Sequence, residues 1–394
     1  MTDRWYFQLP TRIQFGRGGL RKLGQTARHF GRSVLLVGYR DCGDLEAAYG
    51  RAAASLGDAG MTVSEFREVP PDPTAELAIE AAQVASGARA DVICALGGGS
   101  VIDAAKAAAL LAKNGGSPWD YTDANPNCRA VADALPLIAV PTTAGTGAEV
   151  TPVAVLTCQG VGSRPGFPLK ASISGTALYP KVALVDPDLA LGSPARLTAA
   201  AGADALAHAV ESCISRRANP LSTALAEKAL GLIARRLPRA VEVPDDPAAR
   251  EPLALAATLA AAALSNAGVT MAHSIAHALG AMLHVPHGEA AAAATPLGLE
   301  YNKQACVDVY SRLAGCCGVA ADSPDRSAQR FVEFISEFLQ SLGLPTRVEL
   351  PAEVPDDLPA LLARNAFLST PIPLKLNPRK IDEAVLAKLL EQLL

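Results

Sequence analysis

Short apolar runs bounded by glycine or proline recur along the first half of the chain. Four of them, residues 33–38, 91–96, 137–140 and 182–185, are rich in valine, isoleucine, leucine and alanine. Helical periodicity lies between the first two runs, as over residues 73–86. Strands that alternate with helices are typical of a largely parallel sheet covered by helices on both faces. The first half is therefore predicted to be an α/β domain.

The pattern changes after Pro187 and Asp188. From Thr198 onward the strand signals disappear and long alanine- and leucine-rich helical stretches take over. We predict an α/β domain over residues 1–190 and an all-α domain over residues 191–394, since 394 residues suffice for two domains. The helices are expected to be broken by prolines at Pro220, Pro238, Pro244, Pro286, Pro296 and Pro345.

Composition narrows the class of protein. The net charge is −4 and no basic block resembles a nucleic-acid footprint. Eight scattered cysteines without a CxxC pair indicate a reduced cytosolic protein. The N-terminus lacks the features of a signal peptide, and the apolar run over residues 253–264 is too short to span a bilayer. We expect a cytoplasmic protein with neither nucleic acid nor membrane as a partner.

Five of the six histidines lie between residues 208 and 287. Asp204 and His208 are four residues apart and therefore share one face of a helix. His273 and His287 would close the site from a second helix and the loop after it. Imidazoles with one carboxylate suit Fe²⁺ or Zn²⁺. A single histidine is usually a core or surface residue, but only His29 lies outside this stretch, so the group favours a metal site.

A glycine-rich turn, Gly97-Gly98-Gly99-Ser100, follows a predicted strand and opens a helix. Unpaired amides at a helix start bind phosphate, and glycines let a pyrophosphate approach the backbone. The motif is neither GxGxxG nor a Walker loop, and a purely structural turn is the alternative; the strand–turn–helix context favours a ligand. Residues 141–149, rich in hydroxyls and glycine, also follow a strand. They would line the nucleotide from its other side, unless they form an ordinary capped loop.

Taken together, these motifs resemble the iron-dependent (group III) alcohol dehydrogenase family. The resemblance covers essentially the whole chain, through residues 10–16, 97–106, 141–149, 204–211, 273–287 and 377–379. It implies a dehydroquinate synthase-like architecture, with a dinucleotide-binding α/β domain, a helical domain and an active site in the cleft between them.

Carried over position by position, the resemblance implies a set of site residues. His277 would be a catalytic histidine beside the substrate that passes the hydroxyl proton to solvent, with a packing histidine as the alternative. His284 is expected to be structural or to support a ligand. The metal would be held by Asp204, His208, His273 and His287. The nicotinamide cofactor, NAD(P), would be held by Gly38, Tyr39, Gly97, Gly98, Gly99, Ser100, Asp103, Thr142, Thr143, Thr146 and Lys170.

Two positions depart from the family's common pattern. Many members carry Thr-Asp at the end of the first strand, where the aspartate binds the adenosine ribose; here Gly38 and Tyr39 stand there. Gly38 would open space beside Tyr39, and Arg40 would pair with a 2′-phosphate, so NADP(H) should be accepted at least as well as NAD(H). Asp41 restoring the acidic role, or a solvated Arg40, is the alternative. Asp72 replaces a common asparagine and is expected to point away from the pyrophosphate.

We therefore predict a metal-dependent oxidoreductase that transfers a hydride between an alcohol, or its aldehyde or ketone, and a nicotinamide cofactor. The alternatives are a glycerol dehydrogenase-like or dehydroquinate synthase-like enzyme, and a non-catalytic nucleotide-binding protein with a structural metal. The Asp204–His208 pair favours the iron branch. Residues 5–9 are predicted to form an apolar edge strand, and such strands tend to be covered. Members of the resembled family are commonly dimers or larger oligomers. Together with the edge strand, this resemblance predicts a homodimer or larger homo-oligomer.

Overall fold

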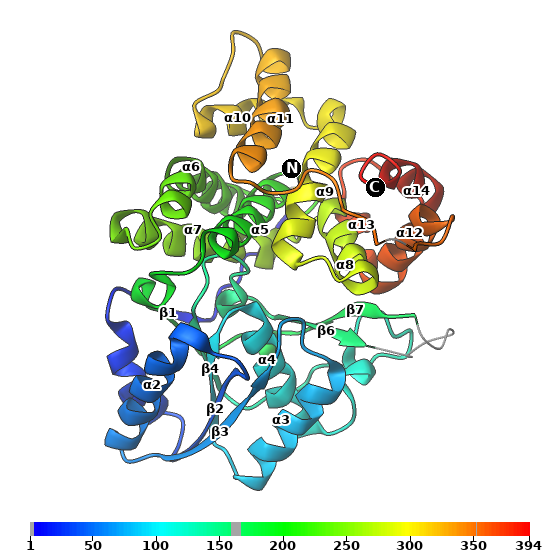
Figure 1. Ribbon diagram of the computed structural model, residues 1–394. Helices are drawn as coiled ribbons and strands as arrows, with labels where there is room; N and C mark the ends of the chain where they lie inside the picture. The colour runs from blue at the N-terminus through cyan, green and yellow to red at the C-terminus, as the bar shows by residue number, and fades with distance from the viewer. Residues whose placement is uncertain (1–3, 159–166, 352) are drawn as a thin grey trace. The chain divides into compact units, whose positions relative to one another are not determined.

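The chain forms two compact units in the computed structural model, which describes residues 4–158, 167–351 and 353–394. The sheet unit comprises Leu9–Leu191, and the helical unit comprises Met1–Gln8 with Gly192–Leu394. Figure 1 shows the strands confined to the sheet unit and long helices filling the other. An N-terminal parallel-sheet unit followed by a helical unit confirms the predicted fold class.

The sheet unit is built on six parallel strands in the order β1-β8-β5-β4-β2-β3. The four predicted runs form its interior strands, which are almost wholly buried. The edge strands β1 and β3 did not stand out in the sequence because they carry charged and exposed residues. The strand bounds are β1 (Arg12–Phe15), β2 (Ser33–Tyr39), β3 (Thr62–Val69), β4 (Val92–Gly97), β5 (Leu137–Pro141) and β8 (Val182–Val185).

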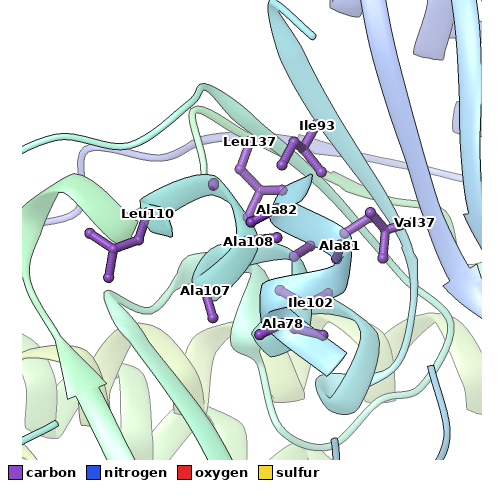
Figure 2. Close-up of a cluster of buried hydrophobic side chains, with 14 of the residues drawn as sticks. Val37, Ala78, Ala81, Ala82, Ile93, Ile102, Ala107, Ala108, Leu110 and Leu137 are labelled. Carbon is purple, nitrogen blue, oxygen red and sulfur yellow. The ribbon is translucent and has the colours of Figure 1, made fainter. Parts of the chain in front are cut away.

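Helices cover both faces of this sheet. On one face, α1 (Leu23–Ala27) and α2 (Glu46–Asp58) pack against it. On the other, α3 (Ala75–Gly87) and α4 (Gly99–Asn114) do so. Figure 2 shows small alanine side chains on α3 and α4 together with the larger strand side chains of Val37, Ile93 and Leu137. Small residues let the helix backbones approach closely, which buries α4 almost completely.

A two-stranded antiparallel hairpin, β6 (Val153–Cys158) and β7 (Leu169–Ser174), lies beside α4. Short 3₁₀ helices complete the connections. Their bounds are η1 (Gly19–Lys22), η2 (Gly43–Leu45), η3 (Pro118–Tyr121), η4 (Ala148–Val150), η5 (Thr176–Leu178), η6 (Pro187–Ala190) and, in the helical unit, η7 (Lys303–Ala305). The hairpin was not predicted, although it carries Lys170.

The described part of the helical unit contains helices and no strand. Prolines open α6 and precede α9, as expected, but Pro238 and Pro296 lie inside these helices, so the predicted breaks there are wrong. Long helices with buried faces tolerate one lost backbone hydrogen bond. The helices are α5 (Ala195–Ile214), α6 (Pro220–Glu242), α7 (Pro247–Ala267), α8 (Met271–Leu283), α9 (His287–Asn302), α10 (Val307–Cys317), α11 (Pro324–Ser341), α12 (Leu358–Ser369), α13 (Pro371–Leu376) and α14 (Glu383–Leu390).

The N-terminal segment departs from the prediction of an edge strand. Residues 5–9 form no strand, and the Tyr6 side chain is 91% exposed. The backbone of Gln8 bonds instead to the side chain of Asn266 on α7, through the Gln8 amide at 2.6 Å and the Gln8 carbonyl at 3.1 Å. The prediction is therefore wrong, and the edge-strand argument for a homo-oligomer no longer applies.

The apolar run over residues 253–264 lies in α7, as a largely buried helix. In the part of the chain that the structure describes, no single helix is long and apolar enough to cross a membrane. The pair α7 and α8 reaches that length and composition only together, with a bend of 105° at the break between them.

Packing between α4 and the sheet gives a stability prediction. Ile102 is fully buried in this layer, so Ile102→Ala should lower the free energy of unfolding by about 2–5 kcal/mol. The matched control is Val84→Ala on α3, where Val84 is 36% exposed and the change should stay within about 0.5 kcal/mol. Urea unfolding followed by circular dichroism measures both. Equal stability of the two variants would show that this layer is not packed as described.

Candidate metal centre and nucleotide-binding turn

Three helices of the helical unit bring the four predicted ligands to one point. Asp204 and His208 lie one turn apart on α5, and α8 and α9 supply the other two histidines. The Nε2 atoms of His208, His273 and His287 each lie 3.4 Å from Oδ1 of Asp204. The rings of His208 and His273 stack with their centroids 4.6 Å apart. Three imidazole nitrogens thus converge on a single carboxylate oxygen.

The donor atoms of this cluster fit a divalent ion. Asp204 Oδ1 and His273 Nε2 are buried and form no hydrogen bond of ordinary geometry within residues 4–158, 167–351 and 353–394. A buried carboxylate without compensation is costly, so the arrangement calls for a positive charge. Ligands about 2.1 Å from a tetrahedral ion lie about 3.4 Å from one another. Asp204, His208 and His273 also hold their donor atoms within 4.8 Å of one another.

Ionisation in the cluster follows from burial and from the two carboxylates. Burial lowers the pKa of His208 to about 4. Burial also opposes charge on His273, but the carboxylates of Glu211 and Asp204 outweigh it and raise the pKa of His273 to about 10. Burial opposes ionisation of Asp204 too, yet the histidines around it hold the pKa of Asp204 well below its usual range. Positive charge is therefore stabilised between Asp204 and Glu211.

Glu211 is the residue at this centre that the sequence did not assign. It lies on α5, seven residues beyond Asp204, and its carboxylate contacts Nδ1 of His273. Its other oxygen accepts hydrogen bonds from the amides of Thr270 and Ala272. The helical spacing from Asp204 was a usable signal, because residues seven apart share one helix face.

The start of α9, which carries His287, is fixed against α5. Arg196 donates two hydrogen bonds to Glu289, at 2.6 and 2.9 Å. Gly288 lies so close to α5 that a Cβ there would be 2.3 Å from the carbonyl oxygen of Ala200. Glycine is therefore required beside His287 for the two helices to meet.

The two remaining histidines of the stretch occupy different places. His277 lies one turn beyond His273 on α8, is only 9% exposed, and has its ring 5.3 Å from that of His287. This places it beside the four predicted ligands. His284 ends α8 with a left-handed backbone, φ 55°, and is exposed. His284 is thus the C-cap residue of α8 and is exposed, unlike the buried Asp204, His208 and His273.

In the sheet unit, the glycine turn joins β4 to α4 as predicted. The amide of Gly98 donates a hydrogen bond to the Tyr39 hydroxyl at 3.0 Å. A Cβ at Gly98 would lie 2.7 Å from that hydroxyl and 3.1 Å from Oγ1 of Thr143. A Cβ at Gly99 would lie 2.6 Å from Thr146. The glycines thus allow Tyr39 and two predicted threonines to close over the turn.

Gly38 does not leave open space beside Tyr39, contrary to the expectation. A Cβ at Gly38 would lie 2.3 Å from the ring of Tyr49, which fills that volume from α2. The Tyr49 hydroxyl accepts a hydrogen bond from the Tyr39 amide and donates one to the carbonyl of Leu96. Glycine at position 38 therefore serves the packing of Tyr49. The sequence did not reveal this contact.

The other predicted cofactor residues lie around the same end of the sheet unit with partners of their own. Asp103 on α4 accepts a hydrogen bond from the amide of Val155 at 3.1 Å, which ties α4 to β6. Thr142 is buried and donates its amide to the carbonyl of Gly97. Ser100 lies in the first turn of α4.

Lys170 on β7 is buried and forms an ion pair with Asp72. Asp72, which replaces a common asparagine, thus turns its carboxylate toward Lys170. The positive charge of the lysine offsets the added negative charge. The backbone of Asp72 is left-handed, with φ 54°, a conformation that aspartate tolerates better than most residues.

The parallel sheet with its glycine turn and the histidine–aspartate cluster together have the features of a metal-dependent dehydrogenase. Comparison with known families agrees with this class. The family described as iron-containing alcohol dehydrogenase matches residues 10–187, and the family described as Fe-containing alcohol dehydrogenase, C-terminal, matches residues 198–394.

Individual relatives align over nearly the whole chain. An NAD-dependent methanol dehydrogenase from Bacillus methanolicus is 32% identical over 92% of this chain and 93% of its own length. A 1-propanol dehydrogenase from Salmonella typhimurium is 33% identical over 98% of this chain and 99% of its own. A crystal structure of an archaeal alcohol dehydrogenase from a Red Sea brine pool, 28% identical, superposes with a TM-score of 0.92 and covers 100% of both chains.

The chain belongs to the iron-containing alcohol dehydrogenase family. It is an oxidoreductase that transfers a hydride between an alcohol and a nicotinamide cofactor.

The geometry of the cluster predicts that a divalent ion stabilises the folded protein. Free Fe²⁺ or Zn²⁺ at about 1,000 times its dissociation constant should add about 4 kcal/mol. This raises the thermal unfolding midpoint of the metal-free protein by on the order of 10 °C, measured by calorimetry. Asp204→Asn should abolish the shift, because it removes the charge at which the three histidines converge.

His284→Asn is the matched control, since asparagine accepts a left-handed backbone and His284 lies outside the centre. It should keep the full shift. A shift that survives in Asp204→Asn would place the ion elsewhere.

Proposed function

We propose that this protein is a divalent-metal-dependent dehydrogenase of primary alcohols and their aldehydes. In this proposal Asp204, His208, His273 and His287 hold the ion. The observation that carries it is the convergence of three Nε2 atoms, each at 3.4 Å, on one buried carboxylate oxygen. Fe²⁺ is the first candidate from the family, and Zn²⁺ the second, because both accept imidazole and carboxylate ligands.

A bound divalent ion would supply the positive charge that stabilises the alcohol oxygen as its proton leaves. The protein's own part is to hold the ligands rigidly and largely away from water. Asp204, His208 and His273 are each less than 10% exposed. His277, one turn from His273 and beside His287, is proposed to accept the hydroxyl proton and release it to solvent.

The nucleotide is proposed to bind at the start of α4. This helix of 16 residues directs the positive end of its dipole and its first backbone amides to that point. Of the turn residues 97–100, only Ser100 has a side chain, so the turn itself leaves the amides open to a phosphate. The Tyr39 hydroxyl already occupies the Gly98 amide, so the amides of the following residues are the proposed phosphate donors. Thr143 and Thr146 are proposed to border the bound nucleotide.

The choice of primary alcohols rests on the relatives. Relatives of about one-third identity include enzymes named for methanol, 1-propanol, 1,3-propanediol and long-chain alcohols. Methanol, 1-propanol and 1,3-propanediol each have a hydroxyl on a terminal carbon that carries at least two hydrogens, and they differ in chain length and in the presence of a second hydroxyl. A non-catalytic nucleotide-binding protein with a structural metal is disfavoured, because the relatives aligned over the full chain are dehydrogenases.

Metal dependence is the direct test of this function. NADH consumption at 340 nm should be measured with a panel of primary aldehydes after chelation and after Fe²⁺ or Zn²⁺ is restored. Chelated protein should lose activity and regain it with the ion. His208→Ala and His287→Ala should lose bound metal and rate together, by about 100-fold or more.

His284→Asn serves again as the control and should retain both metal and rate. Full activity in a sample shown by elemental analysis to be metal-free would overturn the proposal.

We also propose that NADP(H) is accepted at least as well as NAD(H). Tyr39 supplies no carboxylate to repel a 2′-phosphate, and Arg40 follows it directly. Arg40 forms an ion pair with Glu68 at 2.9 Å, and both side chains are more than half exposed. Such a pair is weak, so Arg40 remains available to a phosphate.

Two variants test this preference in opposite directions. Arg40→Gln should lower kcat/KM for NADPH by about two- to fivefold, while Glu68→Gln should raise it, because it removes the competing carboxylate. Neither should change kcat/KM for NADH comparably. A preference of the parent for NADH by about a hundredfold or more would contradict the proposal.

A further inference from the structure

We propose that Glu211 is a positioning residue, which fixes the proton of His273 on Nδ1 and leaves Nε2 free to bind the ion. This inference rests on the proposed metal centre and assigns a role to a residue outside the predicted ligand set. It starts from the contact between the Glu211 carboxylate and Nδ1 of His273, deep inside the helical unit.

The protonation pattern follows from what a carboxylate can do. An ionised carboxylate only accepts hydrogen bonds, so the imidazole nitrogen that faces Glu211 must carry the hydrogen. The form of His273 that binds an ion is neutral and carries one hydrogen; with that hydrogen on Nδ1, Nε2 presents its lone pair to an ion held beside Asp204 Oδ1. Without Glu211 the two tautomers would compete, and one of them would point a hydrogen at the ion.

His208 offers an internal contrast. Its Nδ1 is buried and forms no hydrogen bond with any residue that the structure describes, so no partner comparable to Glu211 is seen on its ring. Of these two imidazoles, only His273 is held by a carboxylate on the side away from Asp204. Such outer carboxylates orient a ligand and raise its basicity, and losing one typically costs about 10- to 100-fold in metal affinity.

Glu211 also joins the two helices that carry the ligands. Its second oxygen accepts from the Thr270 amide at 3.0 Å, the Ala272 amide at 3.2 Å and the Thr270 hydroxyl. These donors stand at the start of α8, where Thr270 provides no side-chain cap of its own. A negative charge at a helix start is favourable. One side chain of α5 thus caps α8 and orients its first histidine.

Glu211→Gln separates these two functions. If the amide oxygen stays on the Thr270 and Ala272 amides, the cap survives, but the amide NH₂ then faces Nδ1 of His273. That arrangement drives the hydrogen to Nε2, where it blocks the ion. If the amide flips, donors face donors at the start of α8, and the cap is lost instead. Glutamine cannot satisfy both ends, whereas aspartate keeps the accepting chemistry on a shorter stem.

The experiment measures the Zn²⁺ dissociation constant of full-length protein by competition with a chromophoric chelator. Glu211→Gln should weaken binding by about 10- to 100-fold, and Glu211→Asp should bind more tightly than Glu211→Gln. Thr270→Val is the matched control: it removes one donor from the cap but leaves the carboxylate on His273. It should lower the thermal unfolding midpoint while changing the dissociation constant less than about threefold.

An unchanged dissociation constant in Glu211→Gln would overturn the inference. So would equal weakening by Glu211→Gln and Thr270→Val, because the effect would then come from capping. If Glu211→Gln does not fold, the same comparison between Glu211→Asp and Thr270→Val decides. His208→Ala tests the metal centre separately: retention of Zn²⁺ by that variant would refute the centre itself. Loss of Zn²⁺ there, with normal binding in Glu211→Gln, would refute only the role of Glu211.

Discussion

The helical unit depends on two buried carboxylates that need positive charge. Asp204 and Glu211 both lie on α5 and are each about 2% exposed. Burying a carboxylate is costly unless a counter-charge and hydrogen bonds compensate. Glu211 obtains them from the start of α8 and from His273, whereas Asp204 Oδ1, among the described residues, faces three imidazoles and forms no hydrogen bond. A divalent ion would balance both negative charges at once.

Close packing around α5 keeps the two buried carboxylates and their histidine partners in place. Small residues let its neighbours approach: a Cβ at Gly202 would lie 2.4 Å from Leu237 of α6, and Gly288 meets Ala200 at the start of α9. The buried Glu211 carboxylate joins α5 to α8, and the Arg196–Glu289 pair joins α5 to α9. These two contacts bring the histidines of α8 and α9 to the side of α5 that carries Asp204. Rigid ligands on helices favour a defined coordination geometry.

Much of this arrangement could be predicted from the sequence, for identifiable reasons. Interior strands of a parallel sheet are buried on both faces, so β2, β4, β5 and β8 appear as continuous apolar runs. The i, i+4 spacing of Asp204 and His208 identifies a shared helix face. What escaped prediction depends on contacts between distant residues. Glu211 meets His273 across 62 positions, Gly38 is required by Tyr49, and the Gln8 backbone is held by Asn266.

The central claim is that Asp204, His208, His273 and His287 form one metal centre. X-ray absorption at the Zn edge of the Zn²⁺-loaded protein tests it most directly. We expect a nitrogen and oxygen shell at about 2.0–2.2 Å with the outer scattering of three imidazoles, and loss of the bound Zn²⁺ in His208→Ala. A shell containing sulfur at about 2.3 Å, or an oxygen shell without imidazole scattering, would contradict it.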